Sequence, residues 1–113
     1  MAAVIHLVRD RATPEQIAEM RETLGDYIKL AVDVEQGVLA GGGAMHADCE
    51  AALLENGSFQ ENVWGAGWYP EAQQVTFDSL INIRPRQGNR GLEVQDLALR
   101  QRIEAIVRER FAS

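Results

Sequence analysis

The stretch YIKLAVDV, residues 27–34, constrains the fold of this chain more than any other segment. Its side chains alternate, which places Ile28, Leu30, Val32 and Val34 on one face of a strand. The polar and small residues between them point to the other face. The letters EQG then turn the chain, and Val38–Ala40 returns, which predicts a β-hairpin. A sheet with one apolar face needs a second layer to cover it.

Two helices are predicted to supply that layer. The letters TPEQ at residues 13–16 offer a capping threonine, a proline for the first turn and a capping-box glutamine. Apolar residues then follow at helical spacing: Ile17, Met20 and Leu24. Gly25 is expected to end this helix. The second helix is predicted over Leu97–Phe111, with Asp96 as its N-cap. Its apolar stripe consists of Leu99, Ile103, Ile106 and Val107.

Further strands are expected at Ala3–Val8 and Gln74–Pro85. Residues 45–55 are ambiguous, because their alanines, leucines and glutamates favour a helix. The Asn56–Gly57 pair is nevertheless a tight-turn signal, and residues 58–69 resemble a returning strand. We therefore interpret residues 45–55 as a strand, with a helix as the alternative.

The order of these elements predicts an α+β fold in a single domain, residues 1–113. We expect an antiparallel sheet of about five to six strands built from hairpins, with the N-terminal and C-terminal helices packed on one face. No apolar run approaches the roughly 18 residues that span a bilayer. The N-terminus lacks the features of a secretory signal, and the single cysteine, Cys49, forms no internal disulfide. A cytoplasmic protein without membrane contact is therefore expected.

The net charge of −6 argues against nucleic acid as a partner. The charge is uneven: residues 1–78 carry four basic and 13 acidic side chains, whereas residues 79–113 carry seven basic and four acidic ones. The basic part is expected to pack against the acidic part, within the chain or across the subunits of a homo-oligomer. The alternative is an anion-binding site in the basic part.

His46, Asp48 and Glu50 share one face if residues 45–55 form a strand. An imidazole beside two carboxylates could hold a divalent metal as a cofactor, or act as an acid or base. The bland alternative is a solvated polar face. Asp78 and Asn82 are poor strand residues, which makes them candidates for a site. If the polar strand faces form a groove, these two residues could converge there with His46, Glu50 and Arg84.

The letters RPRQGNR, residues 84–90, place three arginines around a glycine. Arg84, Arg86 and Asn89 could clamp an anion, although such loops are more often solvated or paired with carboxylates. Trp64 and Trp68 share one strand face and suggest core packing, the wall of a pocket or a subunit interface. The glycines between them leave room for another surface to approach closely.

Several segments together resemble a family of small bacterial proteins of about 110 residues that is classed as a domain of unknown function. These segments are IHLVRDRATPEQI, YIKLAVDV, GVLAGGG, HADCE, WGAGWYP and INIRPRQGN. The resemblance covers nearly the whole chain and implies a single-domain protein. It implies no activity, cofactor or catalytic residue.

Three functional hypotheses follow. The first is a binding module for a small anionic ligand, which uses the polar sheet face with Asn82 and the arginine loop, walled by Trp64 and Trp68. The second is a small hydrolase in which His46 is base or metal ligand and Asp48, Glu50 and Asp78 orient it or bind metal. The third is a non-enzymatic, oligomeric interaction protein.

Overall fold

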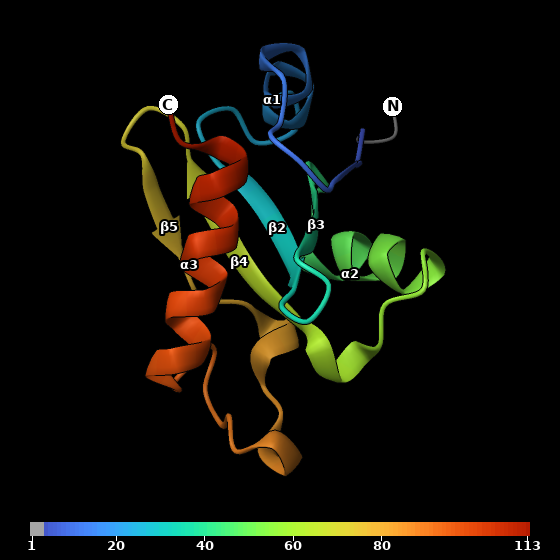
Figure 1. Ribbon diagram of the computed structural model, residues 1–113, viewed down its shortest axis with the longest axis vertical. Helices are drawn as coiled ribbons and strands as arrows, with labels where there is room; N and C mark the ends of the chain where they lie inside the picture. The colour runs from blue at the N-terminus through green and yellow to red at the C-terminus, as the bar shows by residue number, and fades with distance from the viewer. Residues whose placement is uncertain (1–3) are drawn as a thin grey trace.

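A computed structural model describes residues 4–113 and confirms the α+β class (Figure 1). Its sheet has five antiparallel strands in the order β1-β3-β2-β4-β5. The strands are β1 (His6–Val8), β2 (Ile28–Asp33), β3 (Val38–Gly41), β4 (Val63–Tyr69) and β5 (Gln74–Thr76). The helices are α1 (Pro14–Arg21), α2 (His46–Glu55) and α3 (Leu97–Phe111), with short 3₁₀ turns η1 (Gln60–Asn62), η2 (Leu80–Asn82) and η3 (Pro85–Gln87). The predicted start of the first strand, Ala3, lies outside the described residues.

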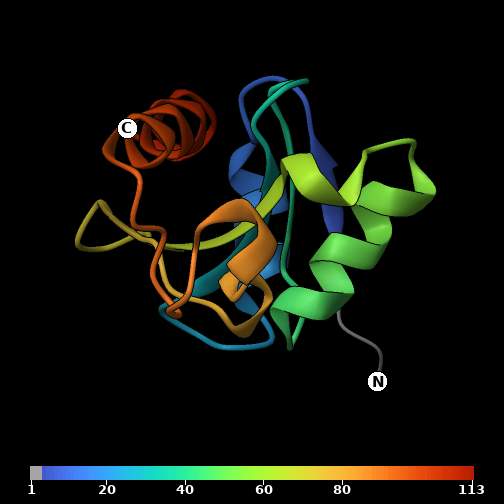
Figure 2. The same ribbon diagram turned by 90° about the horizontal axis from the view of Figure 1, so that it is seen from below.

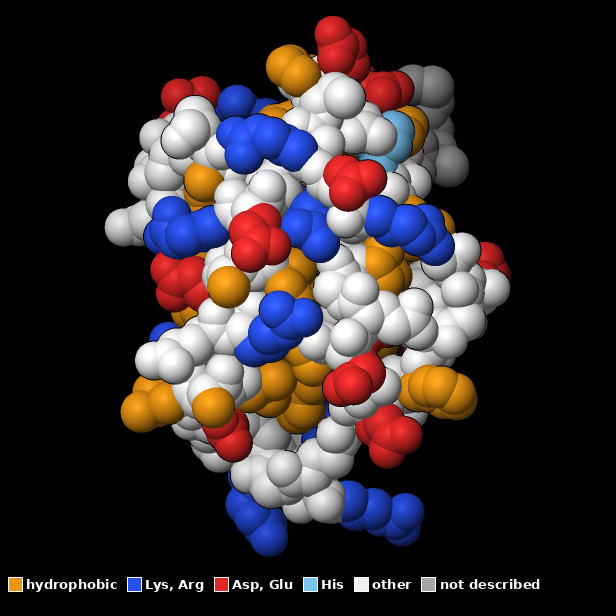
Figure 3. Space-filling model, in the orientation of Figure 1, with side chains coloured by type: hydrophobic (Ala, Val, Ile, Leu, Met, Phe, Trp, Pro, Cys, Tyr) orange, Lys and Arg blue, Asp and Glu red, His pale blue; other side chains and the backbone are white. Residues whose placement is uncertain are grey.

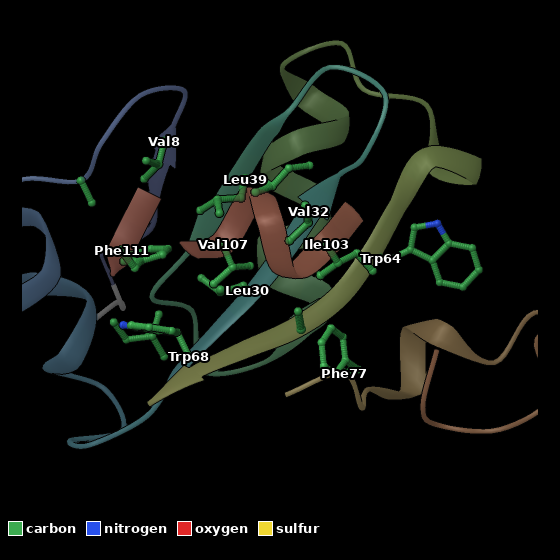
Figure 4. Close-up of a cluster of buried hydrophobic side chains, with 14 of the residues drawn as sticks. Val8, Leu30, Val32, Leu39, Trp64, Trp68, Phe77, Ile103, Val107 and Phe111 are labelled. Carbon is green, nitrogen blue, oxygen red and sulfur yellow. The ribbon is translucent and has the colours of Figure 1, made fainter. Parts of the chain in front are cut away.

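The predicted N-terminal and C-terminal helices contribute side chains to the same core cluster on one face of the sheet, and their predicted caps are confirmed. Thr13 and Gln16 form the capping box of α1, and Asp96 caps α3 through the backbone N–H of Leu99. Helix α1 ends at Arg21, so Leu24 lies beyond it and is exposed. Figure 4 shows side chains of the central strands meeting those of α3: Leu30, Val32, Leu39, Ile103 and Val107.

The prediction of a strand at residues 45–55 is wrong, because this segment forms α2 on the opposite face of the sheet (Figure 2). Cys49 and Leu53, one helical turn apart, are buried against small sheet residues such as Ala31 and Ala40. The Asn56–Gly57 pair ends this helix, with Gly57 at φ +101°, instead of turning a hairpin. A glycine in the left-handed conformation occurs both at the end of a helix and in a tight hairpin turn. The Asn56–Gly57 pair alone therefore could not distinguish a helix from a hairpin.

The prediction of a continuous strand over Gln74–Pro85 is also wrong. Strand β5 ends at Thr76, and the chain then folds across β4 through η2 and η3. A Cβ atom at Gly65 would overlap the side chain of Ser79, and one at Gly67 would overlap Tyr27. The glycines of WGAGW therefore permit the expected close approach, and the approaching surface is the chain itself.

No helix among residues 4–113 is both long and apolar enough to cross a bilayer.

Candidate functional site

A cavity of about 370 Å³ lies where the start of α2 meets the polar face of the sheet and the segment around η2. Its polar lining residues are Tyr27, Lys29, His46, Asp78 and Ser79. Its apolar lining residues include Met45, Leu80 and Leu92. We call this space the His46 cavity. It brings His46 and Asp78 together, as the groove hypothesis requires, although neither residue lies on a strand of the sheet, contrary to the prediction from the sequence.

His46 is the first residue of α2, and its ring is held by the sheet. Its Nε2 lies 2.8 Å from the carbonyl oxygen of Ala66 in β4, so the ring donates Nε2–H to that oxygen. Burial lowers the pKa of His46, and the nearby ammonium of Lys29 adds to this effect. A neutral ring that donates through Nε2 has Nδ1 as its acceptor. His46 can therefore accept a hydrogen bond or a proton from a bound molecule.

Lys29 provides the positive charge of the cavity and is the only lysine in the chain. It lies in β2, and its Nζ donates to the carbonyl oxygen of Ala44 at 3.1 Å. Within residues 4–113 it forms no ion pair with a carboxylate. An ammonium has three donors, so Lys29 retains capacity for an anionic group.

Tyr27 and Asp78 line the same cavity. The Tyr27 hydroxyl lies 2.8 Å from Thr76 Oγ1, and its ring packs on that of Tyr69 at 4.5 Å between centroids. Burial raises the pKa of Tyr27, and the charge of Asp78 contributes. Asp78 is exposed and, within the described part of the chain, pairs with no basic side chain.

Two further features surround these polar groups. Met45, Leu80 and Leu92 are 57%, 73% and 47% exposed, so apolar surface faces solvent beside the charged groups. The N-cap of α2 is Met45, which makes no side-chain hydrogen bond to the first turn. The positive end of this helix therefore lacks a side-chain cap.

Glu50 and Arg84 lie apart from the His46 cavity and bind each other. Their side chains are 13% and 11% exposed, and Arg84 Nη2 lies 3.3 Å from Glu50 Oε2. Arg84 also donates to the carbonyl oxygens of Ile81, Gln60 and Val63, and its guanidinium covers the ring of Trp64 at 4.6 Å. Burial lowers the pKa of Arg84, and the charge of Glu50 opposes this effect. These contacts occupy the guanidinium and hold η2 and η3 against β4.

The two asparagines proposed as ligand-binding residues are also engaged within the chain. Asn82 is fully buried and bonds to both the N–H and the carbonyl of Gly65. Asn89 is 4% exposed, donates to three backbone carbonyls and accepts from the N–H of Gln95. Arg86 is exposed and lines a second cavity of about 630 Å³ with Glu50 and Arg84.

Trp64 and Trp68 belong to the core, where they are 4% and 0% exposed. Trp68 stacks with Phe111 of α3 at 6.2 Å, so it holds the helix layer to the sheet. Of the three contexts suggested by the sequence, core packing is the one that these positions support.

The metal hypothesis required His46, Asp48 and Glu50 to share a strand face. On α2, Glu50 stays on the side of His46 but turns to Arg84, and Asp48 is exposed and lies outside the His46 cavity. Among residues 4–113, no group of three or more His, Cys, Asp or Glu side chains is placed to hold a metal ion.

Sequence reasoning singled out His46 and Asp78 but missed Tyr27 and Lys29. The signal for both was the alternation of YIKLAVDV, which puts them on the sheet face opposite to the main core. That face is covered by α2 and η2 instead of solvent, so its polar residues became the lining of a cavity.

The comparisons with known proteins agree with the resemblance drawn from the sequence segments. The family model described as "Protein of unknown function (DUF5674)" matches residues 6–110. No curated protein and no solved structure matches the chain. Since the family model spans nearly the full length of the sequence, this protein belongs to the DUF5674 family, whose function is unknown.

Proposed function

We propose that this protein binds a small molecule with an anionic group, such as a carboxylate or a phosphate, in the His46 cavity. The observation that carries the proposal is the convergence of Lys29, His46 and Tyr27 from two separate segments on one cavity. Binding pockets typically combine a mostly apolar lining with a few convergent polar groups, which describes this cavity.

The ammonium of Lys29 supplies the charge that an anionic group requires. Its one hydrogen bond, to Ala44, leaves donors available, and no carboxylate within residues 4–113 neutralises it through an ion pair. The N-terminus of α2, where Met45 provides no side-chain cap, adds positive electrostatic potential beside Lys29. Anion binding is therefore assigned to Lys29, in place of the arginine loop favoured by the sequence.

The arginine loop is less suited to this role because its central residues hold the fold. Arg84 is bonded to three carbonyl oxygens and to Glu50, and Asn82 and Asn89 are buried in backbone contacts. A ligand that recruited these groups would have to break those bonds. Arg86 and Arg90, which are both exposed, remain available on this loop.

A catalytic role for His46 is the second candidate, supported by one observation. His46 and Asp78 line the same cavity, and the neutral ring presents Nδ1 as a base. Glu50, the third residue of the sequence hypothesis, is paired with Arg84 and does not line this cavity. Turnover of a bound ester or phosphate ester that is lost in His46→Gln would support this candidate.

The binding proposal is tested by thermal unfolding with acetate, benzoate, inorganic phosphate and phenyl phosphate as probes. A ligand at 100 times its dissociation constant stabilises the fold by about 2.7 kcal/mol, which raises the melting temperature of a domain of this size by roughly 10 °C. We expect at least one probe to do so in the wild type and in Arg90→Met. The same probe should have little effect on Lys29→Met.

Arg90 is a matched control because it is an exposed cation outside the His46 cavity. Equal stabilisation of Lys29→Met and the wild type, or no stabilisation by any of the four probes, would contradict the proposal.

A further inference from the structure

We infer that the ligand of the His46 cavity is a zwitterion with an apolar side chain, of the class of the apolar α-amino acids. This inference rests on the proposed function and specifies the ligand more closely. An anion needs one positive group, whereas this cavity also presents a carboxylate and an apolar rim.

The first argument is the pair of opposite charges. Lys29 comes from β2 and Asp78 from the segment after β5, and they line one cavity without forming an ion pair with each other. His46 experiences both charges, since Lys29 lowers its pKa and Asp78 raises it. A ligand with a carboxylate and an ammonium can satisfy both groups at once, whereas a simple anion is repelled by Asp78.

The second argument is the acceptor on His46. The bond from Nε2 to the carbonyl of Ala66 makes Nδ1 the acceptor of the neutral ring. A ligand ammonium has three donors, which match the Asp78 carboxylate and this nitrogen. An ionised carboxylate has no donor, so it cannot satisfy Nδ1 without a second, donating group on the ligand.

The third argument is the apolar surface beside these groups. Met45, Leu80 and Leu92 line the cavity and are each about half exposed or more. An aliphatic or aromatic side chain on the ligand would remove this surface from water. The volume of about 370 Å³ lies near the lower end of the range for ligand pockets, which suits a metabolite the size of an amino acid.

The test compares ligands that differ by one charged group. L-leucine, L-methionine and L-phenylalanine are titrated into the full chain by calorimetry, beside 4-methylpentanoate, which lacks the ammonium, and 3-methylbutylamine, which lacks the carboxylate. Glycine serves as the zwitterion without a side chain. We expect at least one of the three amino acids to bind tenfold or more tightly than each of these three analogues.

Two variants assign the charges to residues. Asp78→Asn should weaken the best amino acid at least tenfold, because it removes the partner of the ammonium. It should not weaken 4-methylpentanoate, because it also removes the charge that repels an anion. Lys29→Met should weaken both ligands. Glu93→Gln is the matched control, since Glu93 lies opposite Asp78 in a β-bridge but does not line the cavity.

The outcomes separate this inference from the proposed function. Binding of 4-methylpentanoate as tight as that of the best amino acid would overturn the zwitterion and leave the anion site standing. Equal affinity of Asp78→Asn and the wild type for the amino acid would also overturn it. Binding of neither the amino acids nor any anionic probe would overturn both.

Discussion

A single side chain, Asn82, takes the place of a missing strand beside β4. Strand β5 pairs only with Gly67–Tyr69, so the N–H and carbonyl of Gly65 lie beyond its end. The amide of Asn82 bonds to both groups and also donates to the carbonyls of Phe77 and Leu92. It thereby satisfies buried backbone groups that would otherwise be costly, and it sets the path of the chain that closes the His46 cavity.

Asn82→Ala should lower the free energy of unfolding by about 3 kcal/mol, because it leaves several buried backbone groups unpaired. Urea denaturation measures this change. Asn56→Ala is the control, since Asn56 is exposed at the end of α2, and we expect it to change stability by less than about 0.5 kcal/mol. Equal effects of the two substitutions would show that the bonds of Asn82 contribute little.

His46 should make the stability of the fold depend on pH in a predictable direction. Burial lowers its pKa from the ordinary value of 6.5, so below about pH 6.5 the unfolded chain binds more protons at this residue than the fold does. Its contribution is fully present above pH 6.5 and is lost as the pH falls toward the lowered pKa. The free energy of unfolding, measured from pH 5 to pH 8, should therefore fall more steeply at acid pH in the wild type than in His46→Gln. A wild type that gains stability relative to the variant at acid pH would contradict this assignment.

At the scale of elements, local signals predicted well and non-local ones did not. The capping box at Thr13, the cap at Asp96 and the alternation of residues 27–34 each act within a few residues, and all three are confirmed. The conformation of residues 74–85 depends on the hydrogen bonds between Asn82 and Gly65, which is 17 positions away. A local pattern of alternating residues cannot reveal such a contact. The strand pattern there was real, but tertiary contacts overrode it.

The same distinction explains the candidate site. His46 and Asp78 stand out as polar residues within apolar patterns, and the fold brings them together. Lys29 does not stand out in the sequence, because a charged residue on the polar face of a strand is typical of a solvated surface. In the sequence, an arginine that binds an anion and one that holds the fold have the same residue type and spacing. Only the contacts of Arg84 with Glu50 and Trp64 show that it has the structural role.

The N-cap position of helix α2 lacks a side chain that can cap the helix. Met45 has the extended backbone of an N-cap, with φ −132° and ψ 148°, but no side-chain oxygen. Met45→Ser should raise the free energy of unfolding by about 1 kcal/mol, because a serine hydroxyl can accept from the first turn. Thermal unfolding measures the gain, and Ala44→Ser, one residue earlier, should give none. A gain from Ala44→Ser, with none from Met45→Ser, would place the start of α2 one residue earlier.

The whole molecule keeps the charge asymmetry of the sequence. Among the ion pairs of residues 4–113, Glu50–Arg84 alone joins the acidic part, residues 1–78, to the basic part, residues 79–113. Figure 3 shows acidic and basic side chains interspersed on the face seen there, with apolar side chains exposed between them. Within the chain, one mostly buried ion pair therefore provides the expected packing of basic against acidic groups. Association between copies of the chain through opposite charges stays a prediction.

If opposite charges hold a homo-oligomer together, salt should dissociate it. Sedimentation velocity at about 0.02 M and about 0.5 M sodium chloride tests this, because the screening length falls from roughly 20 Å to about 4 Å between these conditions. We expect a larger species at low salt that shifts toward the 12.5 kDa chain at high salt. A monomer under both conditions would reject the homo-oligomer, and an oligomer indifferent to salt would point to an apolar interface instead.

The central claim is that the His46 cavity, and not the arginine loop, binds an anionic ligand. Backbone amide NMR of the full chain, titrated with the probe that stabilises it most, locates the bound molecule directly. We predict that the largest shifts fall on residues 27, 29, 45–47 and 78–81, which line the His46 cavity. Shifts confined to residues 84–90 would contradict the claim and return the anion site to the arginine loop.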